Sequence, residues 1–99
     1  MHARLRVKVR YFAAVREIVN LREEILEIED GSIVIDLLRF LATKYGDKFR
    51  EYLFEPKSEN PKPYLHFFLN EKSIAGIDGY STKLSNDCTF AIIPPVGGG

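Results

Sequence analysis

The sequence predicts an α+β roll of two layers, in which a mixed sheet of four to five strands packs on one main helix. Three observations predict this fold. Residues 4–11 and 22–30 alternate apolar and charged residues, as half-buried strands do. Residues 34–45 alone carry the apolar period of a long helix. Finally, the elements follow the order strand, short helix, strand, long helix, loop, strand, small elements, strand.

The first strand is expected at residues 4–11, which alternate over their whole length. Leucine, valine and tyrosine side chains share one face, and four basic side chains share the other: Leu5, Val7, Val9 and Tyr11 against Arg4, Arg6, Lys8 and Arg10. Phe12 follows in phase with the basic face. The i, i+3, i+4 spacing of Val15, Ile18 and Val19 then predicts a short helix.

The second strand and the main helix follow. Leu26 and Ile28 alternate with glutamates, which predicts a strand over residues 22–30. Asp30-Gly31-Ser32 is a turn sequence, and Ser32 is the expected N-cap of the next helix. The apolar side chains of that helix recur at helical spacing: Val34, Leu37, Leu38, Leu41 and Tyr45. Gly46 is the expected left-handed residue at its C-terminal end.

The second half of the chain is less regular. Residues 47–54 are compatible with a helical turn, and residues 55–63 with an exposed loop that contains three prolines. A third strand is expected within residues 64–74, with a turn at Asn70-Glu71, followed by brief elements. The last strand is residues 88–93, which Pro94-Pro95 ends because proline cannot donate to a ladder. If the first and last strands lie side by side, the tail leaves from the middle of the sheet.

Composition bounds the function. Ninety-nine residues form one domain, and 14 basic residues balance 14 acidic ones, so we expect neither a nucleic acid nor an anionic membrane as partner. One cysteine excludes an internal disulfide and a cysteine-based zinc cluster, and two scattered histidines predict no metal site. No apolar run has the length of a membrane span or the pattern of a signal peptide, so a cytoplasmic location is expected.

No catalytic constellation is present in the sequence. Cys88 lies in the phase of Phe90 and Ile92, which predicts a small buried side chain rather than a nucleophile. We find no phosphate-binding loop, no catalytic triad and no carboxylates paired for acid–base chemistry. The protein alone is therefore expected to catalyse nothing.

The C-terminal sequence FAIIPPVGGG is unusual for the end of a compact domain. Glycines have no side chain to pack, and ordering them costs more backbone entropy than ordering any other residue. We therefore expect a folded domain over residues 1–96 and a flexible glycine tail over residues 97–99. A tail of this kind suits a function that needs a thin, exposed backbone.

Four segments, in order, resemble one known family. VKVRYFAAVREIV, DGSIVIDLLRFLATKYG, FLNEKSI and LSNDCTFAIIPPVGGG are similar to the start, main helix, third strand and C-terminal end of the small subunit of molybdopterin synthase. The match covers most of the chain and is poorest at residues 47–64. The resemblance implies the β-grasp fold of ubiquitin and a role as a sulfur carrier.

The resemblance also implies a chemistry and partners. Gly99 would be adenylated by a ubiquitin-activating-type enzyme that uses ATP, and no cofactor would be bound by the carrier itself. The resulting thiocarboxylate would give its sulfur to a pterin precursor inside the large subunit, for the molybdenum or tungsten cofactor. Gly97 departs from the family, which often has serine or threonine before the terminal Gly98-Gly99 pair.

A docking surface is expected beside the tail. Phe12, Phe68 and Ile93 all fall on the outer phase of their strands, and neighbouring strands would bring them together. The segment that follows them, Pro94, Pro95 and Val96, completes the expected partner-binding set. The two prolines restrict the exit of the tail and so reduce the entropy lost on docking.

Three other functions share these features. A ubiquitin-like modifier would join Gly99 to lysines of target proteins through the same adenylate. A thiamine-pathway sulfur carrier would be similar but shorter, and such carriers usually lack a segment like residues 11–19. A plain interaction module would have no chemistry at its end and would tolerate a C-terminal extension.

Overall fold

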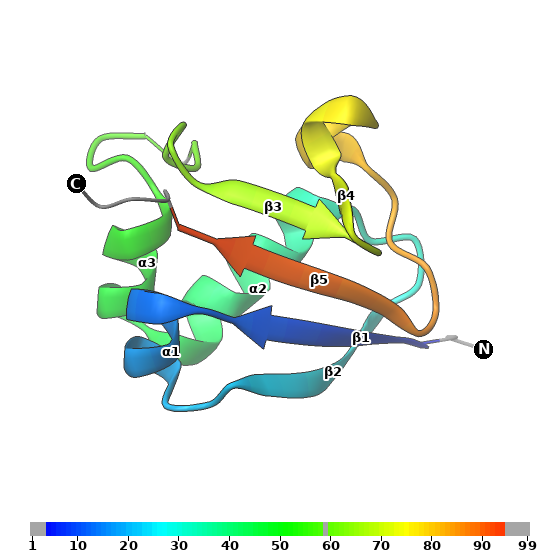
Figure 1. Cartoon of the computed structure of the whole chain (residues 1–99), viewed down its shortest axis with the longest axis horizontal. Coiled ribbons are helices and arrows are strands. Elements are labelled where there is room, and N and C mark those ends of the chain that lie inside the picture. Colours follow the sequence, from blue (N-terminus) through cyan, green and yellow to red (C-terminus); the bar gives the residue numbers. More distant parts are fainter. Residues whose placement is uncertain (1–3, 59, 95–99) are drawn as a thin grey trace.

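A computed structural model describes residues 4–58 and 60–94 of the chain. Five strands form one mixed sheet in the order β2-β1-β5-β3-β4, and the helices cover one of its faces (Figure 1). The strands are β1 (Arg4–Tyr11), β2 (Glu23–Glu29), β3 (His66–Leu69), β4 (Lys72–Ser73) and β5 (Cys88–Ile93). This arrangement is the ubiquitin-like β-grasp roll that the resemblance implied.

The first and last strands lie side by side at the centre of the sheet. β5 runs parallel to β1 and antiparallel to β3, and β2 and β4 are the two edges. The inner faces of these strands are buried, as their alternation predicted. The prediction that the chain end leaves from the middle of the sheet is confirmed up to Pro94, the last described residue.

The helical layer contains more than the one predicted main helix. α2 (Val34–Tyr45) and the short α1 (Ala13–Val19) lie where their spacing predicted. Residues 47–54, expected to form a helical turn at most, contain a third helix, α3 (Asp47–Leu53). Phe49 and Leu53 of α3 are fully buried, so this segment is part of the core rather than a connection.

Both caps of α2 differ from their predictions. Ser32 is not the N-cap: its hydroxyl donates to the Glu29 carbonyl at 2.7 Å, and the N-cap is Ile33. The Ile33 N–H donates instead to the Asp36 carboxylate at 3.0 Å. Gly46 has the expected positive φ of +89°, but its ψ of −161° lies outside the left-handed helical region. That backbone conformation lets α3 start directly after α2 and is open essentially to glycine alone.

The β3–β4 connection is the predicted tight turn. Asn70 and Glu71 both have positive φ, at +49° and +70°, as a two-residue hairpin turn of this hand requires. Two single-turn 3₁₀ helices, Ile74–Gly76 and Gly79–Ser81, fill the stretch expected to hold brief elements.

A partly buried carboxylate joins the two layers at one end of the sheet. The Tyr11 hydroxyl donates to the Glu24 carboxylate at 2.5 Å, and the Tyr45 hydroxyl donates to the same oxygen. The Lys44 ammonium lies 4.0 Å from the second oxygen. Burial and the nearby carboxylate raise the pKa of Tyr11, and the same causes raise the pKa of Tyr45 to about 12. Both phenols therefore stay protonated and able to donate.

Candidate functional site

The central strand delivers the C-terminal part of the chain to one end of the sheet. Tyr11 and Ile92 form the last pair between β1 and β5. On the other side of β5, Ile93 pairs with His66 of β3. Pro94 is half-buried at this point. The predicted partner-binding residues Pro95 and Val96, the glycines Gly97, Gly98 and Gly99, and the predicted domain boundary lie outside the described residues.

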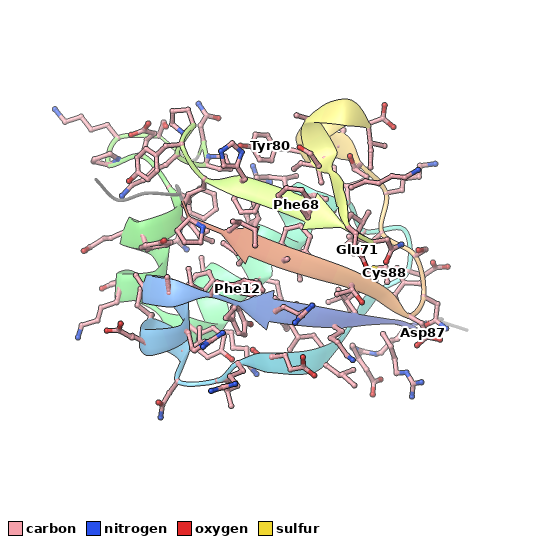
Figure 2. All side chains as sticks on the ribbon, in the orientation of Figure 1. Phe12, Phe68, Glu71, Tyr80, Asp87 and Cys88 are labelled. Atoms are coloured by element: carbon pink, nitrogen blue, oxygen red, sulfur yellow. The ribbon has the colours of Figure 1, made fainter. Side chains whose placement is uncertain are left out.

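Apolar side chains gather on the open face of the sheet beside this end. Ala91 of β5 pairs with Arg10 on one side and with Phe68 on the other, and Ile93 is the next outward residue of β5. Phe12 follows the last residue of β1. Figure 2 shows Phe12 directly after β1 and Phe68 on β3, the two strands that flank β5. We name Phe12, Phe68, Ala91 and Ile93 the outer patch.

The structure brings the predicted residues to one face but leaves them half-buried rather than exposed. Phe12 is enclosed the most clearly, because two guanidinium groups lie over its ring, Arg10 at 5.6 Å and Arg16 at 5.9 Å from the centroid. Arg16 also donates to the Tyr11 carbonyl at 3.3 Å, which holds it in place. This end of the outer patch therefore presents cations together with an aromatic ring.

The sequence alone did not assign Ala91 to the outer patch. It is the smallest member and lies between Arg10 and Phe68, at the centre of the outer patch. Its alternation phase is that of Ile93, so the strand period could have identified it.

Charged side chains continue along the same face of the sheet, away from the outer patch. Lys8 and Arg10 each lie 3.8 Å from the Glu23 carboxylate, and Arg6 lies 3.3 Å from Asp87. These exposed pairs fit the interpretation of the basic row as a solvated face. Next to them is a hollow of about 270 Å³ whose lining is entirely polar or charged: Lys8, Arg10, Glu23, Asn70, Glu71 and Thr89.

Within the described part of the chain, Cys88 is not arranged as a catalytic nucleophile. Cys88 is 2% exposed, and burial raises the pKa of its thiol, so it is the inert core residue that its phase predicted. Among residues 4–58 and 60–94, no three histidine, cysteine, aspartate or glutamate side chains gather as a metal site. Within the same ranges, no helix has the length and apolar character needed to span a bilayer.

Comparison with known proteins identifies the family. The sequence model of the ThiS family matches residues 9–99. The chain belongs to the ThiS family. This ThiS-family chain is 30% identical to small archaeal modifier protein 3 of Haloferax volcanii over 95 residues, which are 96% of this chain and all of that protein.

Two further relatives of the ThiS-family chain are a sulfur carrier subunit and a second modifier protein. It is 28% identical to the molybdopterin synthase sulfur carrier subunit of Chlamydomonas reinhardtii, over 96% of this chain and all of that protein. The solution structure of small archaeal modifier protein 1 from Methanosarcina acetivorans has a TM-score of 0.82 and 31% identity, over 98% of this chain and 99% of that one. The relatives thus include both sulfur carriers and ubiquitin-like modifiers.

Proposed function

We propose that this chain is the sulfur carrier and small subunit of molybdopterin synthase, and that it acts through the carboxylate of Gly99. An activating enzyme joins this carboxylate to the α-phosphate of ATP and releases pyrophosphate. A sulfur nucleophile then attacks the acyl carbon, and AMP leaves. In the large subunit the sulfur passes to a pterin precursor, and oxygen from water restores the carboxylate.

One observation carries the proposal: the strand that leads to the glycines is the central strand of the sheet, and it ends beside the outer patch. A rigid central strand fixes where the tail begins. The outer patch offers a partner a surface at the same end of the molecule, so docking of the body and capture of the tail can occur together. The carrier supplies no catalytic group of its own.

The number of residues in the tail fits this division of labour. Five residues follow Pro94 in the sequence. A fully extended chain of five residues reaches at most about 18 Å. That reach lets a carboxylate enter an active site in another protein while the folded body stays outside, and glycine lets other backbones approach closely.

The decisive experiment is ATP–pyrophosphate exchange with the cognate activating enzyme, next to a thermal melt. Deleting Gly98 and Gly99, or adding one residue after Gly99, should abolish exchange. The melting temperature should stay unchanged, because these glycines bury almost no apolar area. Gly98→Leu should slow exchange, whereas a matched change in the body, Ile77→Leu, should not. Full exchange by the extended protein would exclude both the carrier and the modifier.

The relation to modifier proteins supports a second candidate, in which Gly99 becomes joined to lysines of other proteins. The observation that favours it is the 30% identity to small archaeal modifier protein 3. The two functions share the adenylate and differ in the final acceptor. Mass spectrometry of native material distinguishes them: sulfur in place of one terminal oxygen indicates the carrier, and Gly-Gly remnants on lysines of other proteins indicate the modifier.

We propose the molybdenum-cofactor pathway rather than the thiamine pathway because of the segment that follows β1. Thiamine-pathway carriers usually lack such a segment, and here it contains α1, with Val15 and Val19 buried in the core. Its removal would therefore open the core. A sulfur-transfer assay with purified thiocarboxylate decides between the branches, since the proposal requires sulfur to reach the pterin precursor when the large subunit is present.

A further inference from the structure

The β2 edge of the sheet has unused backbone hydrogen-bonding groups. The Tyr11 N–H donates to the Arg22 carbonyl at 2.9 Å, and the antiparallel register continues from that pair. In such a ladder alternate residues point their N–H and C=O groups toward the neighbouring strand. Glu24, Leu26 and Ile28 therefore bond to β1. Glu23, Ile25 and Glu27 point their backbone groups away from the sheet.

A groove runs beside the C-terminal end of this edge, between β2 and α2. It is a hollow of about 760 Å³ with an apolar floor of Ile28, Leu37 and Phe40. Phe40 is 43% exposed, which is unusual for so large an apolar side chain on a helix that packs its other apolar residues inside. The rim carries three carboxylates and one guanidinium: Glu29, Asp30, Asp36 and Arg4.

We propose that the β2 edge and this groove bind an extended segment of another protein whose side chains alternate between basic and apolar residues. The segment adds a sixth strand by bonding to the free groups of Glu23, Ile25 and Glu27. Its apolar side chains face the helical layer and enter the groove over Phe40. Its basic side chains face the opposite side, next to the glutamates of β2.

The fold already contains a strand of this kind on the other side of β2. β1 places apolar side chains against the core and pairs its basic residues with the outer row of β2: Arg4 with Glu29, Arg6 with Glu27, Lys8 with Ile25 and Arg10 with Glu23. A segment that binds at the free edge would meet the same outward-facing residues of β2, Glu23, Ile25, Glu27 and Glu29. Opposite charges across neighbouring strands are favourable, which specifies a basic partner.

The same charges argue against a second copy of this chain as the occupant. Antiparallel pairing of β2 with itself would place glutamates opposite glutamates, and like charges directly opposite are destabilising. Charged edges are also a common protection against edge-to-edge association. A basic segment removes this repulsion, whereas a second β2 strand doubles it.

The groove lies at the other end of the sheet from the chain end. Glu29 pairs with Arg4 at the start of β1, whereas Ile92 pairs with Tyr11 at its end. Seven residue steps along a strand correspond to about 23 Å. Figure 1 shows the same separation, with the start of β1 and the end of β5 at opposite sides. A partner in the groove thus leaves the outer patch free, and this inference does not depend on the proposed function.

The test uses the full chain and a labelled synthetic peptide of the basic–apolar type, acetyl-RLRVKVR-amide, which repeats residues 4–10. Its control carries glutamate at each basic position. Fluorescence anisotropy should show saturable binding of the basic peptide and roughly tenfold weaker binding of the acidic one. Absence of binding by the basic peptide, or equal binding of both, would overturn the proposal.

Three variants locate the bound peptide. Ile25→Pro removes one outward N–H without removing a bond to β1, so it should weaken binding roughly tenfold, whereas Ile25→Ala keeps that donor and should weaken it less. Glu27→Lys and Phe40→Ser should also weaken it, with Phe40→Leu as the matched control. Thermal melts verify folding. Unchanged binding by Ile25→Pro would show that the peptide does not bind at the β2 edge. If the wild type proves to be a dimer and Ile25→Pro a monomer, a second copy of the chain occupies this edge, and the proposal of a basic partner is wrong.

Discussion

At the scale of single residues, Glu24 links the sheet to the helical layer through hydrogen bonds. It is a carboxylate with 14% exposure that accepts from Tyr11 and Tyr45. Glu24→Ala removes the charged acceptor of both hydroxyl groups, so we expect a loss of about 2 kcal/mol in the free energy of unfolding.

Urea denaturation measures this loss, and Glu23→Ala is the matched control. Glu23 is the adjacent glutamate, but it is 49% exposed and meets its cations at 3.8 Å. Exposed pairs of this kind contribute little, so the control should change stability by less than about 0.5 kcal/mol. Equal losses of stability for the two variants would show that the hydrogen bonds of Glu24 to Tyr11 and Tyr45 contribute no more than the exposed ion pairs of Glu23.

The same cluster predicts how stability depends on alkaline pH. Folding raises the pKa of Tyr45 from 10.0 to about 12 and raises that of Tyr11 further in the same direction. The unfolded state therefore loses its phenolic protons first. The contribution of Tyr45 is fully present below pH 10 and is lost as the pH rises toward 12, whereas that of Tyr11 persists to still higher pH.

Melting temperatures recorded between neutral pH and the alkaline limit check this dependence. The wild type should lose stability steeply above pH 10, and Tyr45→Phe should flatten part of that decline because it removes one titrating group. A profile that is identical in the variant would exclude Tyr45 as a contributor.

At the scale of elements, the β3–β4 hairpin carries a residue in an unfavourable backbone conformation. Glu71 has φ of +70° at the second turn position, where the favoured sequence is Asn-Gly. Glu71→Gly should therefore stabilise the protein by roughly 0.5–1 kcal/mol, because glycine adopts positive φ at little steric cost.

The control for the hairpin is Lys72→Gly, one residue later and inside β4. Glycine in a strand weakens it, so this variant should lower stability while the turn variant raises it. Chemical denaturation of both proteins gives the sign directly. A loss of stability in Glu71→Gly would mean that the side chain contributes more than its backbone conformation costs.

The elements also show why some of the fold was predictable from the sequence. The residues of β1 alternate between apolar and charged without interruption, and α2 has apolar residues at every helical repeat, so the local spacing of apolar residues was enough to predict both elements. α3 has two core residues, Phe49 and Leu53, in seven, which is too short a pattern to establish a helix before its packing is known. The predicted N-cap was wrong for a similar reason. Ser32 and Asp36 are both able to hydrogen-bond to the backbone at the start of α2, and only the structure shows that the Asp36 carboxylate accepts from the Ile33 N–H while the Ser32 hydroxyl donates to the Glu29 carbonyl.

At the scale of the whole molecule, the order of the strands in the sheet could not be predicted from the sequence alone. The outward phase of Phe68 and Ile93 followed from alternation, but their proximity required β3 to lie next to β5. The arginines over Phe12 were not predictable, because one comes from β1 and the other from α1. The β2 groove likewise depends on two elements whose relative placement no local pattern specifies.

The final prediction concerns the outer patch as a docking surface at the end of the central strand. Ile93→Lys places a charge among the apolar side chains of the outer patch, on a strand face where Lys8 already lies in the neighbouring strand. The fold should therefore be retained. We expect binding to the activating enzyme, or to the large synthase subunit, to weaken at least about tenfold, because a partner would have to desolvate the new ammonium group.

Ile77→Lys is the matched control, since Ile77 is an isoleucine with 43% exposure that lies between the two 3₁₀ helices and not in a strand of the sheet. Calorimetric titration of each folded variant with the partner gives the affinities. The basic peptide bound at the β2 edge gives an internal reference, because Ile93→Lys should leave its affinity unchanged if the two surfaces are independent. Equal partner affinities for Ile93→Lys and Ile77→Lys would remove the outer patch from the docking surface, while the role of Gly99 would still be decided by pyrophosphate exchange.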